Sequence, residues 1–341
     1  MLDIDGSFGE GGGQILRSSL ALSLLTGKPF RLRKIRANRQ PKPGLRPQHL
    51  ASVRAAAQIG RAKVTGDAVG SSQLTFEPGS VTAGNYHFAI GTAGSTALVL
   101  HTVYLPLALA GGTNELVLEG GTHNEKAPCF HFLQTTWRAY MAKLGLSVSL
   151  EMERPGFYPR GGGRMVARID PWTKRKPLTL TATAGDNTAT VLSMTAGLPD
   201  HVAKRQARRA TVRLRDAGIE PELTYEEWQG GPGCMLAITV PGGVPSLFFG
   251  LGARGKPAET VADEAANEAL AFRPSGMPVD PHSADQLLLP LSFIDGDSEY
   301  HVSQVTRHLT TNAAVIRKFL DRHIVIEGDE GSPGLVFNRA L

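Results

Sequence analysis

Residues 9–27 read GEGGGQILRSSLALSLLTG, and this stretch predicts the first helix of the fold. A glycine-rich turn leads into a helix expected over residues 14–25, in which leucines recur on one face. Gly27 follows as the stop, because glycine readily adopts the left-handed conformation that ends helices. The stretch therefore predicts an amphipathic helix whose first backbone N–H groups lack helical partners.

Similar units follow along the chain. A strand at residues 30–35, a helix at 47–59 and a strand at 74–76 complete the first unit, and similar elements return at 86–169 and 284–327. We therefore expect an α/β (α+β) fold whose large domain holds three repeated βαβαββ-like units. The later helices are expected at 96–110, 132–144, 284–291 and 311–320, and the later strands at 86–90, 116–118, 147–151, 164–169, 299–302 and 324–327.

The order of elements changes after the basic segment 174–177. We expect residues 178–274 to form a smaller inserted α/β domain, and residues 1–177 and 275–341 to form the large catalytic domain. Within the insert, a first strand is followed by helices expected at 199–217 and 257–272 and strands expected at 220–225, 235–240 and 247–250.

The composition is that of a soluble globular protein. Of the 341 residues, 41% are hydrophobic and 20% are charged, so the chain is too apolar to be disordered. No uninterrupted run of about 18 apolar residues predicts a membrane span, and the acidic start MLDID lacks the features of a signal peptide. Cys129 and Cys234 lack CxxC spacing, so neither a disulfide framework nor a cysteine zinc site is expected. We expect a cytoplasmic protein without a membrane partner.

Basic residues gather in two places, although the net charge is only +5. Lysines and arginines at 31–46 occur without an acid, in a loop that prolines stiffen just before an expected helix. Preorganised cations of this kind favour a phosphate-rich ligand, and a solvated basic loop is the alternative. A second cluster, at 204–215, fits an RNA-binding helix or a solvated face equally well.

One acidic and one basic side chain near the start of the first expected helix suggest ligand binding. Glu10 lies in the glycine-rich turn, where helix N–H groups favour an anion and a carboxylate suits a hard cation between phosphates. Arg17 follows seven residues after Glu10, a separation of about two helical turns. A plain strand-to-helix turn, with Glu10 as an acid at the helix start, is the alternative.

His308 stands out among the ten histidines, none of which forms an HExxH pattern. We expect it immediately before a helix that Thr311 or Asn312 caps. Helix N–H groups and Arg307 would favour the neutral, nucleophilic imidazole. A histidine that only hydrogen-bonds a loop would show the same pattern.

The segment GLGARGKP at 250–257 nearly matches a P-loop. Its last position is Pro257, which lacks the hydroxyl that would bind Mg²⁺ and instead suits the first turn of a helix. We therefore expect a structural loop.

Taken together, these motifs resemble those of RNA 3′-terminal phosphate cyclases. The resemblance follows essentially the whole chain in order, and that family's fold of three repeated units plus a smaller inserted domain agrees with the one expected above. The matching segments are GEGGGQILR (9–17), the loop at 36–49, GGT (120–122), GFYPRGGG (156–163), ADQL (284–287) and HLTTN (308–312).

The resemblance implies a reaction and its requirements. A histidine attacks the α-phosphate of ATP and becomes a covalent histidine–AMP, AMP passes to an RNA 3′-phosphate, and the neighbouring 2′-OH closes a 2′,3′-cyclic phosphate. ATP, a divalent metal ion (Mg²⁺ or Mn²⁺) and an RNA with a 3′-terminal phosphate are thus implied.

By position, the resemblance also implies roles for particular residues. His308 would be the nucleophile and Glu10 a metal ligand, while Pro128 would lie against the adenine. His101 and His282 stand where better-known members have Gln and Tyr, which puts the nucleotide preference in doubt. The nucleotide-binding set is His101, Pro128, His282, Ser283, Ala284, Asp285 and Gln286, and the expected phosphate or RNA contacts are Arg17, Arg39, Arg46 and Gln48.

Three other interpretations remain open at this point. A non-catalytic, cyclase-like RNA-processing factor would lack the nucleophile that His308 offers. A P-loop NTPase is disfavoured by Pro257. A carbon–oxygen transferase of a related repeated fold would need less basic surface than residues 31–46 and 204–215 supply. The sequence leaves the oligomeric state open.

Overall fold

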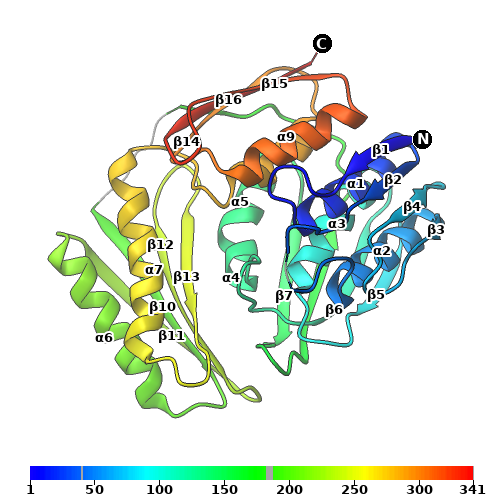
Figure 1. The fold of residues 1–341 in the computed structure, drawn as a ribbon. Coiled ribbons are helices and arrows are strands. Elements are labelled where there is room, and N and C mark those ends of the chain that lie inside the picture. Colours follow the sequence, from blue (N-terminus) through cyan, green and yellow to red (C-terminus); the bar gives the residue numbers. More distant parts are fainter. Residues whose placement is uncertain (40, 182–186, 341) are drawn as a thin grey trace.

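The computed structural model describes residues 1–39, 41–181 and 187–340, and Figure 1 shows their fold. The first unit contains β1 (Leu2–Asp5), α1 (Gly13–Thr26), β2 (Phe30–Arg33), α2 (Pro47–Gly60), β3 (Lys63–Thr65) and β4 (Leu74–Glu77). The second contains β5 (Asn85–Ala89), α3 (Thr96–Ala108), β6 (Asn114–Gly120), α4 (Phe130–Phe132), the π-helical turn η1 (Leu133–Trp137), α5 (Arg138–Lys143), β7 (Val148–Arg154) and β8 (Gly163–Ile169). The third contains β9 (Thr179–Leu180), α8 (Ala284–Leu291), β14 (Ser298–Val302), α9 (Arg307–Phe319), β15 (Arg322–Glu327) and β16 (Gly334–Ala340).

The three units have the same sheet topology, in the orders β1-β2-β4-β3, β5-β6-β8-β7 and β9-β14-β16-β15. In each sheet the first two strands run parallel, and the remaining two add in antiparallel pairs. The repeated α/β architecture expected from the sequence is therefore confirmed. Helix α1 packs against α2, α3 and α9 in the middle of the units (Figure 1), which explains why most of its residues are buried.

Helix α9 begins at Arg307 and not at residue 311, so His308 lies inside its first turn. Thr306 is the cap, because its Oγ1 accepts a hydrogen bond from the backbone N–H of Leu309 at 3.1 Å. The expected capping role of Thr311 or Asn312 is therefore wrong. Both side chains are buried in the helix, where they contact α1 and its preceding loop.

The inserted segment forms a fourth sheet, in the order β11-β10-β12-β13, from β10 (Thr188–Ala196), β11 (Glu220–Trp228), β12 (Gly233–Val240) and β13 (Ser246–Leu251). Helices α6 (Asp200–Asp216) and α7 (Ala258–Phe272) pack on this sheet around a separate apolar cluster that includes Leu236 and Phe248. Strand β9, expected at the start of the insert, pairs with β14 of the third unit. The domain boundaries stay a prediction.

Several basic side chains of the cluster on α6 pair with acids that the fold brings to them. Arg205 pairs with Glu259 at 2.8 Å, and Asp263 accepts from Arg209 at 2.8 Å and from Arg213 at 2.6 Å. These acids lie on α7, about 50 residues further along the chain. The solvated-face interpretation of residues 204–215 is therefore favoured over RNA binding. Among the described helices, none is long and apolar enough to cross a membrane.

Candidate active site

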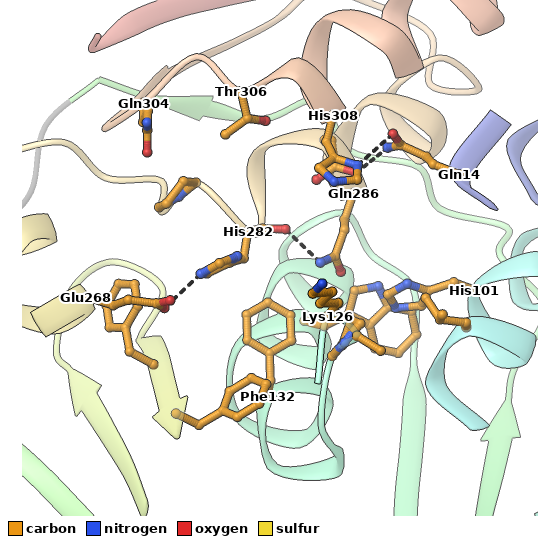
Figure 2. Close-up of a pocket in the computed structure, with 18 of the residues that line it drawn as sticks. Gln14, His101, Lys126, Phe132, Glu268, His282, Gln286, Gln304, Thr306 and His308 are labelled. Atoms are coloured by element: carbon orange, nitrogen blue, oxygen red, sulfur yellow. Dashed lines mark hydrogen bonds and ion pairs between the residues drawn. The ribbon is translucent and has the colours of Figure 1, made fainter. Parts of the chain in front are cut away.

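A cavity of about 1040 Å³ lies between the inserted sheet and the repeated units. Its walls come from α1, α3, α8 and α9, from the segment before α4, and from β13 and α7 of the insert. Figure 2 shows Gln14 and His308 together on one side of this space and Glu268 on the other. Segments from the start, middle and end of the chain therefore meet around one space.

His308 lines the cavity and is held by α1 and α8 (Figure 2). Its Nδ1 lies 2.9 Å from Oε1 of Gln14, and Nε2 of Gln14 donates to Oδ2 of Asp285 at 2.6 Å. A carboxylate only accepts hydrogen bonds, so Gln14 turns its nitrogen to Asp285 and its oxygen to His308. The imidazole thus carries its hydrogen on Nδ1. Its Nε2 has no hydrogen-bond partner in the part of the chain that the structure describes.

The environment favours the neutral form of His308. Burial lowers the pKa of this imidazole, and Arg17 and Arg39 lower it further, against the opposing charge of Asp285. Burial in turn raises the pKa of Asp285. The neutral imidazole expected from the sequence therefore follows from burial and not from Arg307, which pairs with Glu330 at 3.1 Å. The role of His308 as a nucleophile stays a prediction.

Only part of the segment 282–286 reaches the cavity. Ser283 is buried, and its Oγ donates to Oδ2 of the buried Asp280 at 2.6 Å. Ala284 is buried as well, under the hydroxyl of Tyr300 that hydrogen-bonds its carbonyl. These two residues hold the segment in place. The side chains that line the cavity are those of His282, Asp285 and Gln286.

His282 is tied to the insert. Its Nε2 lies 2.9 Å from Oε2 of Glu268 on α7 (Figure 2). Burial disfavours the charged imidazole, but the hydrogen bond and charge of Glu268, with Asp280 and Asp285, raise the pKa of His282 overall. A flat ring held at the cavity wall by a carboxylate offers a stacking surface for a nucleobase.

His101 and Pro128 line the same cavity from α3 and from the segment before α4. The His101 ring lies 5.5 Å from that of Trp137, and burial lowers its pKa to about 3. Its Nε2 is buried without a hydrogen-bond partner among the described residues. A buried polar atom of this kind calls for a ligand or a water molecule, so the position suits a nucleotide contact.

A second group of charged side chains surrounds the N-termini of α1 and α2. Gly12, the N-cap of α1, provides no side-chain cap, and a β-carbon on it would overlap the carboxylate of Glu10. That carboxylate pairs with Arg39 through Oε1, while its Oε2 is buried without a hydrogen-bond partner within residues 1–39, 41–181 and 187–340. We call Glu10, Arg17, Arg39, Arg46 and His49 the anion zone.

Arg17 joins the anion zone to the cavity. It lines the cavity. Its guanidinium and the His49 imidazole both lie so close to Gly13 that a β-carbon on this residue would overlap them. Nδ1 of His49 accepts from the backbone N–H of Arg46 at 3.1 Å, so its Nε2 carries the hydrogen. Burial and the arginines at 17, 36 and 46 lower the pKa of His49 to about 3. Uncapped helix N–H groups, arginines and this neutral donor together suit a phosphate.

Gln48 does not line the cavity. Its Cβ lies 2.9 Å from the position that a β-carbon on Gly94 would occupy. Three other residues that the sequence analysis left without a role lie at the site: Gln14, His49 and Glu268. A glutamine at the start of an apolar helix was a usable signal for Gln14. No pattern pointed to Glu268, which belongs to the insert.

The P-loop-like segment is a structural loop, as expected. Nζ of Lys256 donates to Oε2 of Glu264 at 2.6 Å and to the carbonyl of Leu251 at 2.8 Å. Pro257 is the N-cap of α7. The lysine is therefore committed to protein acceptors.

Comparisons with known proteins show what the chain is similar to. The sequence matches a family profile described as "RNA 3'-terminal phosphate cyclase" over residues 8–326. Proteins named "RNA 3'-terminal phosphate cyclase" from Ectopseudomonas mendocina (strain ymp) and Thermococcus kodakarensis are 42% and 43% identical, covering 95% and 98% of this chain and 94% and 96% of theirs. Among solved structures, the enolpyruvyl transferase NikO from Streptomyces tendae covers 63% of this chain and 38% of its own, with 14% identity. Its TM-score of 0.29 supports no structural conclusion.

Proposed function

The chain belongs to the RNA 3′-terminal phosphate cyclase family, and we propose that it uses ATP to convert the 3′-terminal phosphate of an RNA into a 2′,3′-cyclic phosphate. The observation that carries the proposal is His308, whose neutral imidazole lines the cavity beside Arg17 and Asp285. A non-catalytic RNA-processing factor would need no such nucleophile. The presence of His308 at the cavity therefore favours the enzyme over the non-catalytic factor.

The need for ATP follows from the chemistry of the RNA end. A terminal phosphate dianion has no adequate leaving group, and a covalent intermediate splits one difficult step into easier ones. In the proposed sequence, Nε2 of His308 attacks the α-phosphorus of ATP, the bond to the bridging oxygen breaks, and pyrophosphate leaves with the electron pair. AMP then passes to an oxygen of the RNA 3′-phosphate, which frees the imidazole. The 2′-OH loses its proton, attacks the activated phosphorus and displaces AMP.

The cavity wall supports the binding of a nucleotide. His282 and Pro128 offer surfaces for a base, and Nε2 of His101 and Oε1 of Gln286 are buried polar atoms without a partner among the described residues. Asp285 also lines the cavity, although its Oδ2 is engaged by Gln14. Nucleotide contacts by these residues are part of the proposal.

The anion zone supports the binding of an RNA end. The uncapped N-terminus of α1 and the arginines at 17, 39 and 46 together provide donors for a terminal phosphate next to the cavity. Gln48, at the second position of α2, is proposed as a contact to the RNA and not to ATP. An attacking 2′-OH from the substrate explains why the end must be RNA.

Glu10 is the residue proposed to hold a divalent cation. Its Oε2 is a buried acceptor that nothing within the described ranges satisfies, and a carboxylate suits Mg²⁺ or Mn²⁺. No cluster of three metal-ligating side chains occurs among the described residues, so the ion would depend on phosphate oxygens and water for its remaining ligands. When bound, such an ion neutralises phosphate charge.

The two free, buried cysteines fit the reducing cytoplasm that we propose as the location of the protein.

Incubation with α-labelled ATP, a divalent cation and an RNA 3′-phosphate tests the function. We expect AMP to become bound to the protein through a bond that survives alkali and breaks in acid. The RNA end should become resistant to phosphatase. RNA binding without labelled protein or altered RNA would overturn the proposal and favour the non-catalytic alternative.

A further inference from the structure

We propose that Gln14 is a positioning residue: through a relay from His308 to Gln14 to Asp285, it holds His308 as the Nδ1–H tautomer and turns Nε2 into the cavity. The meaning of this arrangement for catalysis rests on the proposed function. The tautomer itself is a property of the free protein and is tested separately.

The packing of three helices fixes the relay. Gln14 is buried in the first turn of α1, so its amide has little freedom to turn. One helical turn further along both α1 and α9, Oγ of Ser18 donates to Oδ1 of Asn312 at 2.7 Å. Nδ2 of Asn312 donates to the backbone carbonyl of Asp285 at 2.7 Å. A second layer of hydrogen bonds therefore supports the first, and both layers meet at Asp285.

The direction of each hydrogen bond follows from the carboxylate. Asp285 accepts from the amide nitrogen of Gln14, which leaves the amide oxygen to face His308. An oxygen accepts only, so Nδ1 must carry the hydrogen. With Nδ1–H engaged, the lone pair of the neutral ring is on Nε2.

A glutamine in the middle of the relay orients the imidazole without placing a carboxylate directly against it. A carboxylate hydrogen-bonded to Nδ1–H stabilises the imidazolium and makes the ring more basic. The neutral amide of Gln14 orients the ring and keeps Asp285 one residue further away. The imidazole therefore stays unprotonated, as an attacking nitrogen must.

The relay also acts during the attack. As Nε2 bonds to phosphorus, the ring becomes positively charged and Nδ1–H becomes a stronger donor to Oε1 of Gln14. The negative charge of Asp285 lies behind that amide. The interaction is thus stronger in the transition state than in the free enzyme, which raises the rate of adenylation more than the affinity for ATP.

Nitrogen NMR of the protein labelled with ¹⁵N in its histidine rings tests the tautomer without ATP. The His308 signals are identified as those missing in His308→Ala. We expect the Nδ1–H form in the wild type and a shift toward the Nε2–H form in Gln14→Met. The matched control is Gln304→Met, the same substitution at another cavity residue, which should leave the His308 signals unchanged. An Nε2–H form in the wild type, or no change in Gln14→Met, overturns the inference.

Adenylation kinetics test the role of the relay. Gln14→Met should slow adenylation about 10- to 100-fold, the usual effect of removing a supporting hydrogen-bond partner, with little change in KM for ATP. Gln14→Glu places a carboxylate against Nδ1–H, amid Asp285, His282, Arg17 and Arg39, and should move the acid limb of the rate profile to higher pH. A purely structural glutamine would leave that limb in place, which would overturn the inference. If the wild type is never adenylated, the proposed function fails while the tautomer result stands.

Discussion

Within the described residues, two relays of hydrogen bonds each run from a histidine through a second side chain to a carboxylate, and they lie in different surroundings. One joins His308 through Gln14 to Asp285 at the cavity. The other, which we call the junction relay, links the second unit to the insert and consists of His123, His131 and Glu226. In it, Nε2 of His123 lies 3.0 Å from Nδ1 of His131, whose Nε2 lies 3.1 Å from Oε2 of Glu226 on β11.

The two relays differ in whether a histidine ring nitrogen is left without a hydrogen-bond partner. Every ring nitrogen of the junction relay has a partner, since Nδ1 of His123 lies 2.8 Å from Oγ1 of Thr122. The His123 ring also stacks on Phe157, with centroids 4.8 Å apart. At the cavity, Nε2 of His308 lacks a partner within the described ranges. A buried histidine–carboxylate chain therefore does not by itself indicate catalysis. The cavity relay leaves Nε2 of His308 available, whereas the junction relay leaves no ring nitrogen without a partner.

The largest expected effect is on AMP labelling of the protein, which should depend on His308 and not on the junction relay. His308→Ala should reduce AMP labelling of the protein by about 10³-fold or more, because it removes the nucleophile itself. His131→Ala should keep labelling within a few-fold of the wild type, because that ring lies outside the cavity lining. Labelling is measured with α-labelled ATP after acid-free denaturation. Label that persists in His308→Ala would show that another residue accepts AMP.

The sequence predicted the helices better than it predicted the site. Apolar periodicity located α1, α2 and α3 within one or two residues of their observed ends, because their buried faces are encoded locally. The start of α9 was missed, since Thr306 and Thr311 are both possible caps and only tertiary packing decides between them. The pairing of the short strand β9 with β14 was not predicted, because the two strands are more than 100 residues apart.

Contacts between distant segments explain the rest. Gln14 and Asp285 are 271 positions apart, and nothing in either local pattern shows that they meet. Glu259 and Asp263 on α7 pair with arginines of α6, so a segment that is purely basic in sequence is partly paired in space. His308 was recognisable only through its motif, while its tautomer, its burial and its unpaired nitrogen are properties of the assembled fold.

The next largest effect concerns folding stability, which should depend on the junction relay. His131→Ala should lower the free energy of unfolding by about 1–3 kcal/mol, because it leaves the buried Nε2–H of His123 without its acceptor. The exposed His87, which pairs with Glu119 at 3.4 Å, is the matched control, and His87→Ala should cost less than about 1 kcal/mol. Denaturant unfolding measures both. Equal effects of the two substitutions would mean that the junction relay adds no measurable stability.

The smallest effect concerns the pH dependence of adenylation. Only neutral His308 carries the attacking lone pair, and burial lowers its pKa from the ordinary value of 6.5. The neutral form therefore dominates above that lowered pKa, so the adenylation rate should reach half of its plateau below pH 6.5 and fall further toward pH 4.5. His131→Ala should leave this limb where it is, since the junction relay does not contact His308. Single-turnover rates from pH 4.5 to 8 measure the limb. A half-maximum above pH 6.5 would mean that the charge of Asp285 outweighs burial, and the contrast between the two relays would then rest on geometry alone.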